Sequence, residues 1–188
     1  MAANRFRVRK ALPEENDKLA KLGRETFLDT YADENHPEDM AAYLDRSFDP
    51  TIQAAELAAP ASCFLIAEDA TALVGYARLL EAPAPVCIKA EKTIHLMRLY
   101  ARKSWIGCGV GAALMRACID EAKSRQCHGI WLGAWGKNGR ALRFYRQWGF
   151  RQVGEQPFLL GGDRQTDLVL WLPLDTTLAN ASSGKRGL

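Results

Sequence analysis

The sequence lacks the features that mark secreted, metal-binding and membrane-spanning proteins. Its five cysteines are an odd number, none forms a Cys-x-x-Cys pair, and the three histidines show no zinc-ligand spacing with them. No run of about 18 apolar residues occurs, and the N-terminal stretch MAANRFRVRKALPEEN has no apolar signal-peptide segment. We therefore expect reduced thiols, no metal site, no membrane span and a cytoplasmic location.

The sequence also lacks a large excess of either charge. It has 25 Lys and Arg against 22 Asp and Glu, and the resulting formal net charge of +3 is too small to indicate a nucleic-acid partner. Its 48% of hydrophobic and 25% of charged residues are typical of a globular protein. No internal repeat or linker occurs, so we expect one domain over residues 1–174 and a flexible polar tail over residues 175–188.

Short apolar runs and apolar residues at helical spacing are mixed along the chain. They predict the following strands and helices. Strands are expected at residues 6–10, 62–68, 73–80, 93–101, 129–135, 150–158 and 166–172, and helices from residue 13, at 37–46, at 50–57, from the glycine turn to 125, and between Asn138 and Gly149. Because strands and helices are mixed around one sheet, the fold class is α/β in the broad sense that includes α+β.

A glycine-rich turn, residues 107–112 with the sequence GCGVGA, separates a predicted strand from a predicted helix. A helix N-terminus offers unpaired N–H groups, and glycines let a phosphate approach the backbone, so the turn is a candidate pyrophosphate site. The alternative is a tight turn without a ligand. A dinucleotide site would need an acid about 20 residues later, and a Walker A site would need Gly-Lys-Ser/Thr after the glycines. The sequence has neither, which argues against a dehydrogenase or a nucleotide kinase.

Two motifs flank this turn. Residues 138–150 have the form N-x-x-A-x-x-F-Y-x-x-x-G-F, and residues 96–101 read LMRLYA. In this order and separation they closely resemble the GNAT N-acetyltransferase superfamily from about Thr93 to Leu172. A narrower likeness covers nearly the whole chain and resembles the bacterial spermidine/spermine N-acetyltransferase branch. It is carried by Glu25-Thr26-Phe27, Tyr43-Leu44, Ser47-Phe48, Gly75-Tyr76, Trp131-Leu132-Gly133-Ala134-Trp135 and Gly161-Gly162-Asp163-Arg164-Gln165-Thr166-Asp167.

The resemblance implies a single GNAT-type domain with a central mixed, splayed and mostly antiparallel sheet flanked by helices. It also implies acetyl-CoA as the acetyl donor, without a metal. In the family, the strand before the turn binds the pantetheine arm, the turn amides bind the pyrophosphate, and two further side chains lie beside the donor. By this likeness the donor-binding residues are Leu99, Tyr100 and Ala101 for the arm, Ile106, Gly107, Cys108, Gly109, Val110, Gly111 and Ala112 for the pyrophosphate, and Asn138 with Tyr145 beside them.

One departure from the family pattern is Ile106, which stands where Gln or Arg is frequent. Backbone amides make most of that phosphate contact, so we keep the site. Acetyl transfer also needs a donor for the developing oxyanion and a proton for the leaving thiolate. We expect a backbone N–H near Leu99 as the first and Tyr145 as the second, because a phenol has a reference pKa of about 10. Without the motif, Tyr145 would be a core aromatic residue beside Phe144.

From the resemblance we expect His95 to be the base that deprotonates the acceptor amine. Many relatives carry Glu on the central strand where this sequence has His95, four residues before Leu99. Histidine titrates near pH ~6.5 and is suited to accepting a proton. The alternatives are a bound water, an amine that arrives neutral, or His95 as a packing residue.

An acidic segment from Glu25 to Asp49 holds eight acids and one base, so the rest of the chain is net basic. Such an asymmetry suits a cationic amine acceptor and an anionic CoA, although a solvated helix face is the commoner meaning of such charges. We expect a small-molecule acceptor such as a polyamine. A protein lysine or N-terminal acetyltransferase, and a CoA-binding regulatory module without turnover, are the alternatives, and a homodimer is left open.

Overall fold

A computed structural model describes residues 5–174 and shows one seven-stranded sheet in the order β1-β2-β3-β4-β5-β7-β6. All neighbouring strands are antiparallel except β4 and β5, which are parallel. This confirms the predicted mixed, mostly antiparallel sheet. The strands are β1 (Arg7–Lys10), β2 (Ser62–Glu68), β3 (Leu73–Glu81), β4 (Thr93–Ala101), β5 (Gly129–Trp135), β6 (Arg151–Leu160) and β7 (Asp163–Pro173).

The helices begin at the signals that the sequence provides. Pro37 and Pro50 stand at the first positions of two of them, where a missing N–H is harmless, and Asp49 accepts a hydrogen bond from Thr51 N at 2.8 Å as an N-cap. Asn138 caps the helix predicted between Asn138 and Gly149 by accepting from Ala141 N at 3.1 Å. The α-helices are α1 (Asn16–Tyr31), α2 (Pro37–Ser47), α3 (Pro50–Ala58), α4 (Val110–Ser124) and α5 (Gly139–Gln147).

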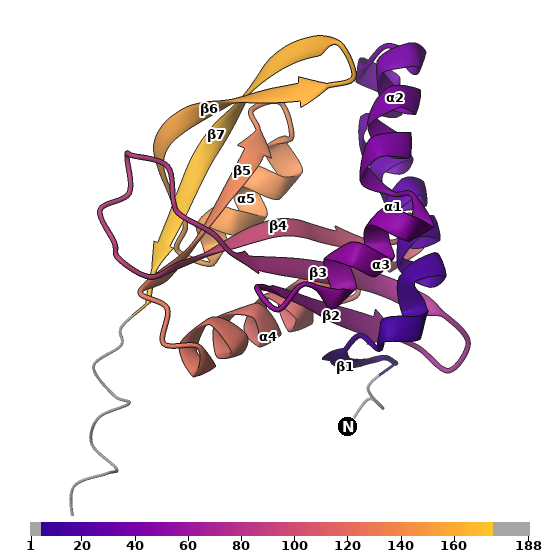
Figure 1. Ribbon diagram of the computed structural model, residues 1–188, viewed down its shortest axis with the longest axis horizontal. Coiled ribbons are helices and arrows are strands. Elements are labelled where there is room, and N and C mark those ends of the chain that lie inside the picture. Colours follow the sequence, from indigo (N-terminus) through magenta and orange to yellow (C-terminus); the bar gives the residue numbers. More distant parts are fainter. Residues whose placement is uncertain (1–4, 175–188) are drawn as a thin grey trace, which may run out of the picture.

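Each face of the sheet is covered by a different set of helices. In β2, Leu65 belongs to the same core as Leu114 of α4, whereas Phe64 and Ile66 pack with Leu22 of α1. This alternation follows from the two-residue period of a strand. α4 and α5 therefore lie on one face, and α1 and α3 cover the other (Figure 1).

The centre of the sheet opens between its two parallel strands. β4 and β5 pair only where Thr93–His95 meets Gly129–Trp131, and beyond this point they diverge (Figure 1). On its other side, β4 has a bulge against β3, because Arg98 pairs with Arg78 and Leu96 with Leu79, which leaves Met97 without a partner. The second half of β4 thus presents backbone groups to the opening.

The β6–β7 hairpin is longer than predicted, since β6 continues to Leu160 and β7 begins at Asp163. Leu160 at the end of β6 is buried in a cluster with Met40 and Leu44 of α2, whereas β7 begins with the polar residues 163–165, which lack a strand-like apolar pattern. Gly161 takes a left-handed φ of +57°, and Gly162 N donates to Asp39 Oδ1 of α2 at 2.6 Å. This contact fastens the hairpin tip to α2 (Figure 1).

Two expectations concern features beyond the sheet. The predicted flexible tail, residues 175–188, lies outside the described residues. Across residues 5–174, no helix combines the length and the apolar character that crossing a membrane requires.

Candidate active site

The opening between β4 and β5 forms a cavity of about 590 Å³, which we call the donor cavity. Its walls come from the second half of β4, the glycine turn, the end of β5 and α5. Most of the predicted donor-binding residues lie in this one lining, although they come from three separate stretches of sequence. They are Leu99, Tyr100, Ala101, Ile106, Gly107, Gly109, Gly111, Ala112, Asn138 and Tyr145.

The glycine turn forms one end of the donor cavity. Gly107 and Gly109 have φ values of +81° and +86°, a backbone region that favours glycine, and a Cβ at either position would meet open space. The first bond of α4 runs from Ala113 N to Gly109 O at 3.0 Å. The amides that precede Ala113 in α4 therefore have no partner within the helix, and they are available to an anion.

Two arginines of α5 add positive charge to this cavity. Arg140 and Arg143 both line it, and among the described residues neither makes an ion pair. Sequence reasoning missed them because they stand at variable positions inside the Asn138–Phe150 motif. Together with the glycine turn they make the donor cavity suited to a phosphate-bearing ligand.

The β4 side of the donor cavity supplies backbone groups. Leu99, Tyr100 and Ala101 lie beyond the last pairing with β5, so their edge is free on that side. The bulge at Met97 turns the backbone of this segment, two residues from the predicted oxyanion donor near Leu99. An extended amide-containing arm can therefore pair with this edge as an additional strand would.

Tyr145 lies in the donor cavity on α5, where its ring packs edge-on against Phe150 with centroids 5.6 Å apart. Burial raises the pKa of Tyr145, so its phenol stays protonated at neutral pH. Asn138 lies in the same lining, with its side-chain oxygen bound to Ala141 N. Tyr145 is thus a neutral proton donor in the same cavity as the free edge of β4.

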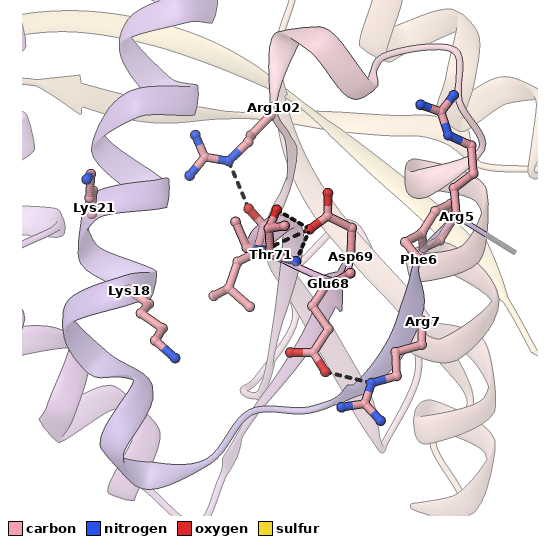
Figure 2. Close-up of a pocket in the computed structure, with 12 residues that line it drawn as sticks. Arg5, Phe6, Arg7, Lys18, Lys21, Glu68, Asp69, Thr71 and Arg102 are labelled. Atoms are coloured by element: carbon pink, nitrogen blue, oxygen red, sulfur yellow. Dashed lines mark hydrogen bonds and ion pairs between the residues drawn. The ribbon is translucent and has the colours of Figure 1, made fainter.

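A larger cavity, of about 830 Å³, lies between α1, β1 and the β2–β3 turn. Several of its polar groups bind one another: Glu68 pairs with Arg7 at 2.7 Å, and Asp69 accepts from Thr71 N at 2.7 Å (Figure 2). Arg102 Nε donates to Leu73 O at 2.8 Å. None of the predicted site residues lines it, so we assign the chemistry to the donor cavity.

Comparison with known families decides the identity of this arrangement. The Acetyltransferase (GNAT) family model matches residues 22–150, which is more than half of the chain. This chain belongs to the GNAT family of acetyltransferases. An N-acetyltransferase from the pepI 3′ region of Lactobacillus delbrueckii subsp. lactis is 33% identical over 161 residues, which cover 86% of this chain and 91% of that protein. An N-acetyltransferase from Mycobacterium bovis is 30% identical over 154 residues, which cover 82% of this chain and 94% of that protein.

Solved structures show the same fold at low sequence identity. The PaiA N-acetyltransferase of Thermoplasma acidophilum, solved with coenzyme A, has a TM-score of 0.73 and 18% identity, covering 90% of this chain and 99% of that one. The yncA structure from Salmonella typhimurium, which contains acetyl-CoA, has a TM-score of 0.69 and 21% identity. The match covers 90% of this chain and 94% of that one. The chain is thus a GNAT N-acetyltransferase, with acetyl-CoA as its donor.

Three predicted site residues of this GNAT protein lie outside the lining of the donor cavity. Cys108 is exposed on the glycine turn, and Val110 is fully buried in the core under α4. His95 stacks on Trp131 with ring centroids 3.6 Å apart. Burial, and then the positive charge of Arg78, lower the pKa of His95 to about 4. The structure therefore supports a packing role for His95 better than a role as base.

A second, small cavity of about 90 Å³ adjoins the donor cavity, and we call it the aromatic pocket. Five residues line both cavities, among them Gly133 and Trp135 of β5. Half of the twelve lining residues are aromatic, and the pocket is covered by α1, α2 and the β6–β7 hairpin. The lining consists of Phe27, Tyr31, Asn35, Tyr43, Met97, Tyr100, Gly133, Trp135, Phe158, Leu160, Gln165 and Asp167.

The acidic segment of α1 and α2 lies mainly around this pocket rather than in it. Glu25 pairs with Arg102, and Asp45 with Arg24 at 2.9 Å. Glu34 is exposed, 3.8 Å from Lys137. None of its acids lines either cavity. Within residues 5–174, no three His, Cys, Asp or Glu side chains are close enough to hold a metal ion.

Proposed function

We propose that this GNAT protein acetylates a primary amine of a small cationic acceptor, such as a polyamine, with donor and acceptor bound together. The observation that carries the proposal is the aromatic pocket, because it adjoins the donor cavity and shares Gly133 with it. Aromatic faces attract an ammonium group by about 0.5–2 kcal/mol each. A pocket rich in them is therefore suited to an alkylammonium.

The cover over the aromatic pocket favours a small acceptor over a protein. The hairpin tip is fastened to α2 by the bond from Gly162 N to Asp39, and Phe158 of β6 packs against Tyr43 of α2 with centroids 5.4 Å apart. A folded protein surface would have to displace this cover to reach the pocket. A flexible amine needs only the narrow space beneath it.

The residues of the donor cavity then divide the work of the reaction. When bound, acetyl-CoA supplies an acetyl thioester. The turn amides of residues 106–112, with Arg140 and Arg143, bind its phosphates, and the edge of Leu99–Ala101 orients its arm. A backbone N–H of β4 near Leu99 stabilises the developing oxyanion. Tyr145 donates its phenolic proton to the sulfur as the bond from carbon to sulfur breaks.

A panel of amines tests the proposal through release of free thiol. We expect turnover with spermidine and spermine, and little with peptides that offer a lysine or an N-terminal amine. Tyr145→Phe should lower kcat about 10²–10⁴-fold, as expected for a lost general acid, and should leave acetyl-CoA affinity nearly unchanged because the ring remains. Turnover with the peptides alone would overturn the acceptor class, and a fully active Tyr145→Phe enzyme would overturn the acid.

A matched pair of variants tests the pyrophosphate site. Gly109→Asn and Gly109→Asp introduce side chains of the same shape at a left-handed position, which Asn and Asp tolerate better than other residues. Only Asp adds a negative charge where we place the phosphates. Calorimetry should show acetyl-CoA binding more weakly to the Asp variant than to the Asn variant, and equal affinities would contradict the assignment.

A further inference from the structure

Asp167 of β7 is a buried carboxylate without a partner among residues 5–174. Its residue is 8% exposed, and its side chain makes no hydrogen bond or ion pair with any described residue. The nearby amide of Gln165 is already bound to Asn35 at 2.7 Å and to Asp163 at 2.8 Å. A buried charge is strongly unfavourable unless something compensates it, so an unpaired carboxylate at this position is suited to binding a cationic group.

The other groups around Asp167 carry no compensating charge. Every other residue in the lining of the aromatic pocket is of an uncharged type. Burial raises the pKa values of Tyr31 from α1, Tyr43 from α2 and Tyr100 from β4, so their phenols stay neutral. Asp167 is thus the single ionisable carboxylate of the pocket.

The cations on neighbouring elements are directed elsewhere. Arg98 of β4 is bound to Glu56 at 2.6 Å, and Arg46 of α2 donates to Leu159 O at 3.2 Å. Arg140 of α5 lines the donor cavity. The pocket therefore lacks a positive charge of its own.

A glycine makes room for Asp167 at the boundary between the two cavities. A Cβ on Gly133 would lie 3.1 Å from Asp167 Oδ2 and 2.6 Å from the Gln156 amide nitrogen. Gly133 lines both cavities, so the carboxylate stands next to the boundary between the donor and the aromatic side chains. Tyr31 and Trp135, with ring centroids 5.8 Å apart, flank the same boundary.

We propose that Asp167 binds the ammonium group of the acceptor inside the aromatic pocket and takes its proton before the acetyl transfer. The proposal rests on the proposed function and assigns the proton-accepting role to Asp167 instead of His95. Asp167 meets both requirements of that role, since it is enclosed with the acceptor and adjoins the donor cavity.

The protons and electrons balance in the following way. Asp167 accepts one proton from the ammonium and later releases it to water. The neutral nitrogen forms a bond to the thioester carbonyl carbon, and the bond from that carbon to sulfur breaks with its electron pair on sulfur. Tyr145 gives its proton to the sulfur and recovers one from the nitrogen, which leaves an amide and a free thiol. One proton is released overall.

The acidity of Asp167 fits this role. Burial raises its pKa to about 6, so the carboxylate is mostly ionised at neutral pH and binds a proton more readily than an exposed Asp. Protonation below pH 6 would remove the base and the binding charge together. We expect an acidic limb near pH 6 in the profile of kcat/KM for spermidine.

Asp167→Asn tests the assignment, with Glu155→Gln as a control that removes an exposed acid from the adjacent strand β6. Asp167→Asn should lower kcat/KM for spermidine about 10²–10⁴-fold, abolish the acidic limb, and leave calorimetric acetyl-CoA affinity within twofold. Glu155→Gln should change none of these. His95→Gln should keep the limb, and a limb lost in His95→Gln but kept in Asp167→Asn would overturn the proposal.

A ligand that cannot react separates this inference from the proposed function. Tetramethylammonium carries a positive charge but no proton and cannot be acetylated. The wild-type protein should bind it in calorimetry, more weakly below pH 6, and Asp167→Asn should bind it at least tenfold more weakly. If no amine in the panel is acetylated, the proposed function fails while this measurement still decides whether Asp167 binds a cation in the aromatic pocket. Equal affinity in the two proteins, or absence of binding to the wild type, overturns the inference.

Discussion

Two carboxylates, the partly buried Glu56 and the buried Asp167, have opposite surroundings. Glu56 of α3 receives Arg78 at 2.5 Å and Arg98 at 2.6 Å, and the side chains of both arginines are less than 10% exposed. Arg98 is held further by Ser47 O at 3.1 Å and lies over the ring of Phe48. Asp167 has no such partner in the part of the chain that the structure describes.

The difference separates a structural charge from a functional one. Glu56 and its two arginines fasten α3 to β3 and β4, and their hydrogen bonds are completed within the protein. Such a network gives little net stability, but it is sensitive to loss of one member. Asp167 destabilises the free protein and becomes useful only with a bound cation. Perturbed ionisable groups that stand in clefts are typical of functional sites.

The largest effect on stability is expected from removing the charge of Glu56, which two arginines neutralise. Glu56→Gln leaves Arg78 and Arg98 buried without a negative partner, which should lower the free energy of unfolding by about 3–5 kcal/mol. Urea denaturation measures this loss directly. The double variant Glu56→Gln, Arg78→Gln also removes one of the two arginine charges left without a partner, and it should recover part of the stability. Unchanged stability in Glu56→Gln would contradict the structural role.

Removing the charge of Asp167 is expected to change stability in the opposite direction. Asp167 has a pKa of about 6 in the folded protein and about 3.9 when unfolded, so its ionisation opposes folding. That penalty is absent below pH 4, develops between pH 4 and 6, and is constant above. Asp167→Asn should therefore raise the free energy of unfolding by about 1–3 kcal/mol at pH 8.

A pH series of thermal melts checks the sign of this effect. The melting temperature of Asp167→Asn should exceed that of the wild type at pH 8, and the two should converge near pH 4. The Glu155→Gln control should follow the wild type throughout. A variant that is less stable than the wild type at pH 8 would show that the carboxylate has a partner within the protein.

The smallest effect is expected from the exposed acids. Asp33 and Glu34 lie on the short 3₁₀ helix Ala32–Glu34 near the aromatic pocket but outside its lining. Their reversal to lysine should raise the KM for spermidine by about two- to threefold at low salt, through long-range attraction alone, and less at high salt. The KM for acetyl-CoA should not rise. A change as large as that of Asp167→Asn would mean that acceptor recognition lies at the surface.

Local sequence signals predicted most of the elements. The bounds of β2, β4 and β5 agree with the prediction because polar, charged or turn residues flank their apolar runs. The β6–β7 hairpin was predicted too short, because its tip is held by contacts distant in sequence, namely the bond from Gly162 N to Asp39 and the packing of Leu160 with α2. A bond to α2 leaves no signal in the sequence of the hairpin itself.

The sequence by itself determined the donor side of this GNAT protein. The positive-φ glycines, the N-cap at Asn138 and Tyr145 on the same helix are local features, and a chain with these residues at this spacing builds that side wherever it folds. The acceptor side was decided by the tertiary structure. Asp167 stands between Thr166 and Leu168 like any polar residue of a strand, and His95 has an ordinary sequence context. The pKa of each depends on burial by segments distant in sequence, so only the folded chain gives Asp167 its charge without a partner and gives His95 its stacking contact with Trp131.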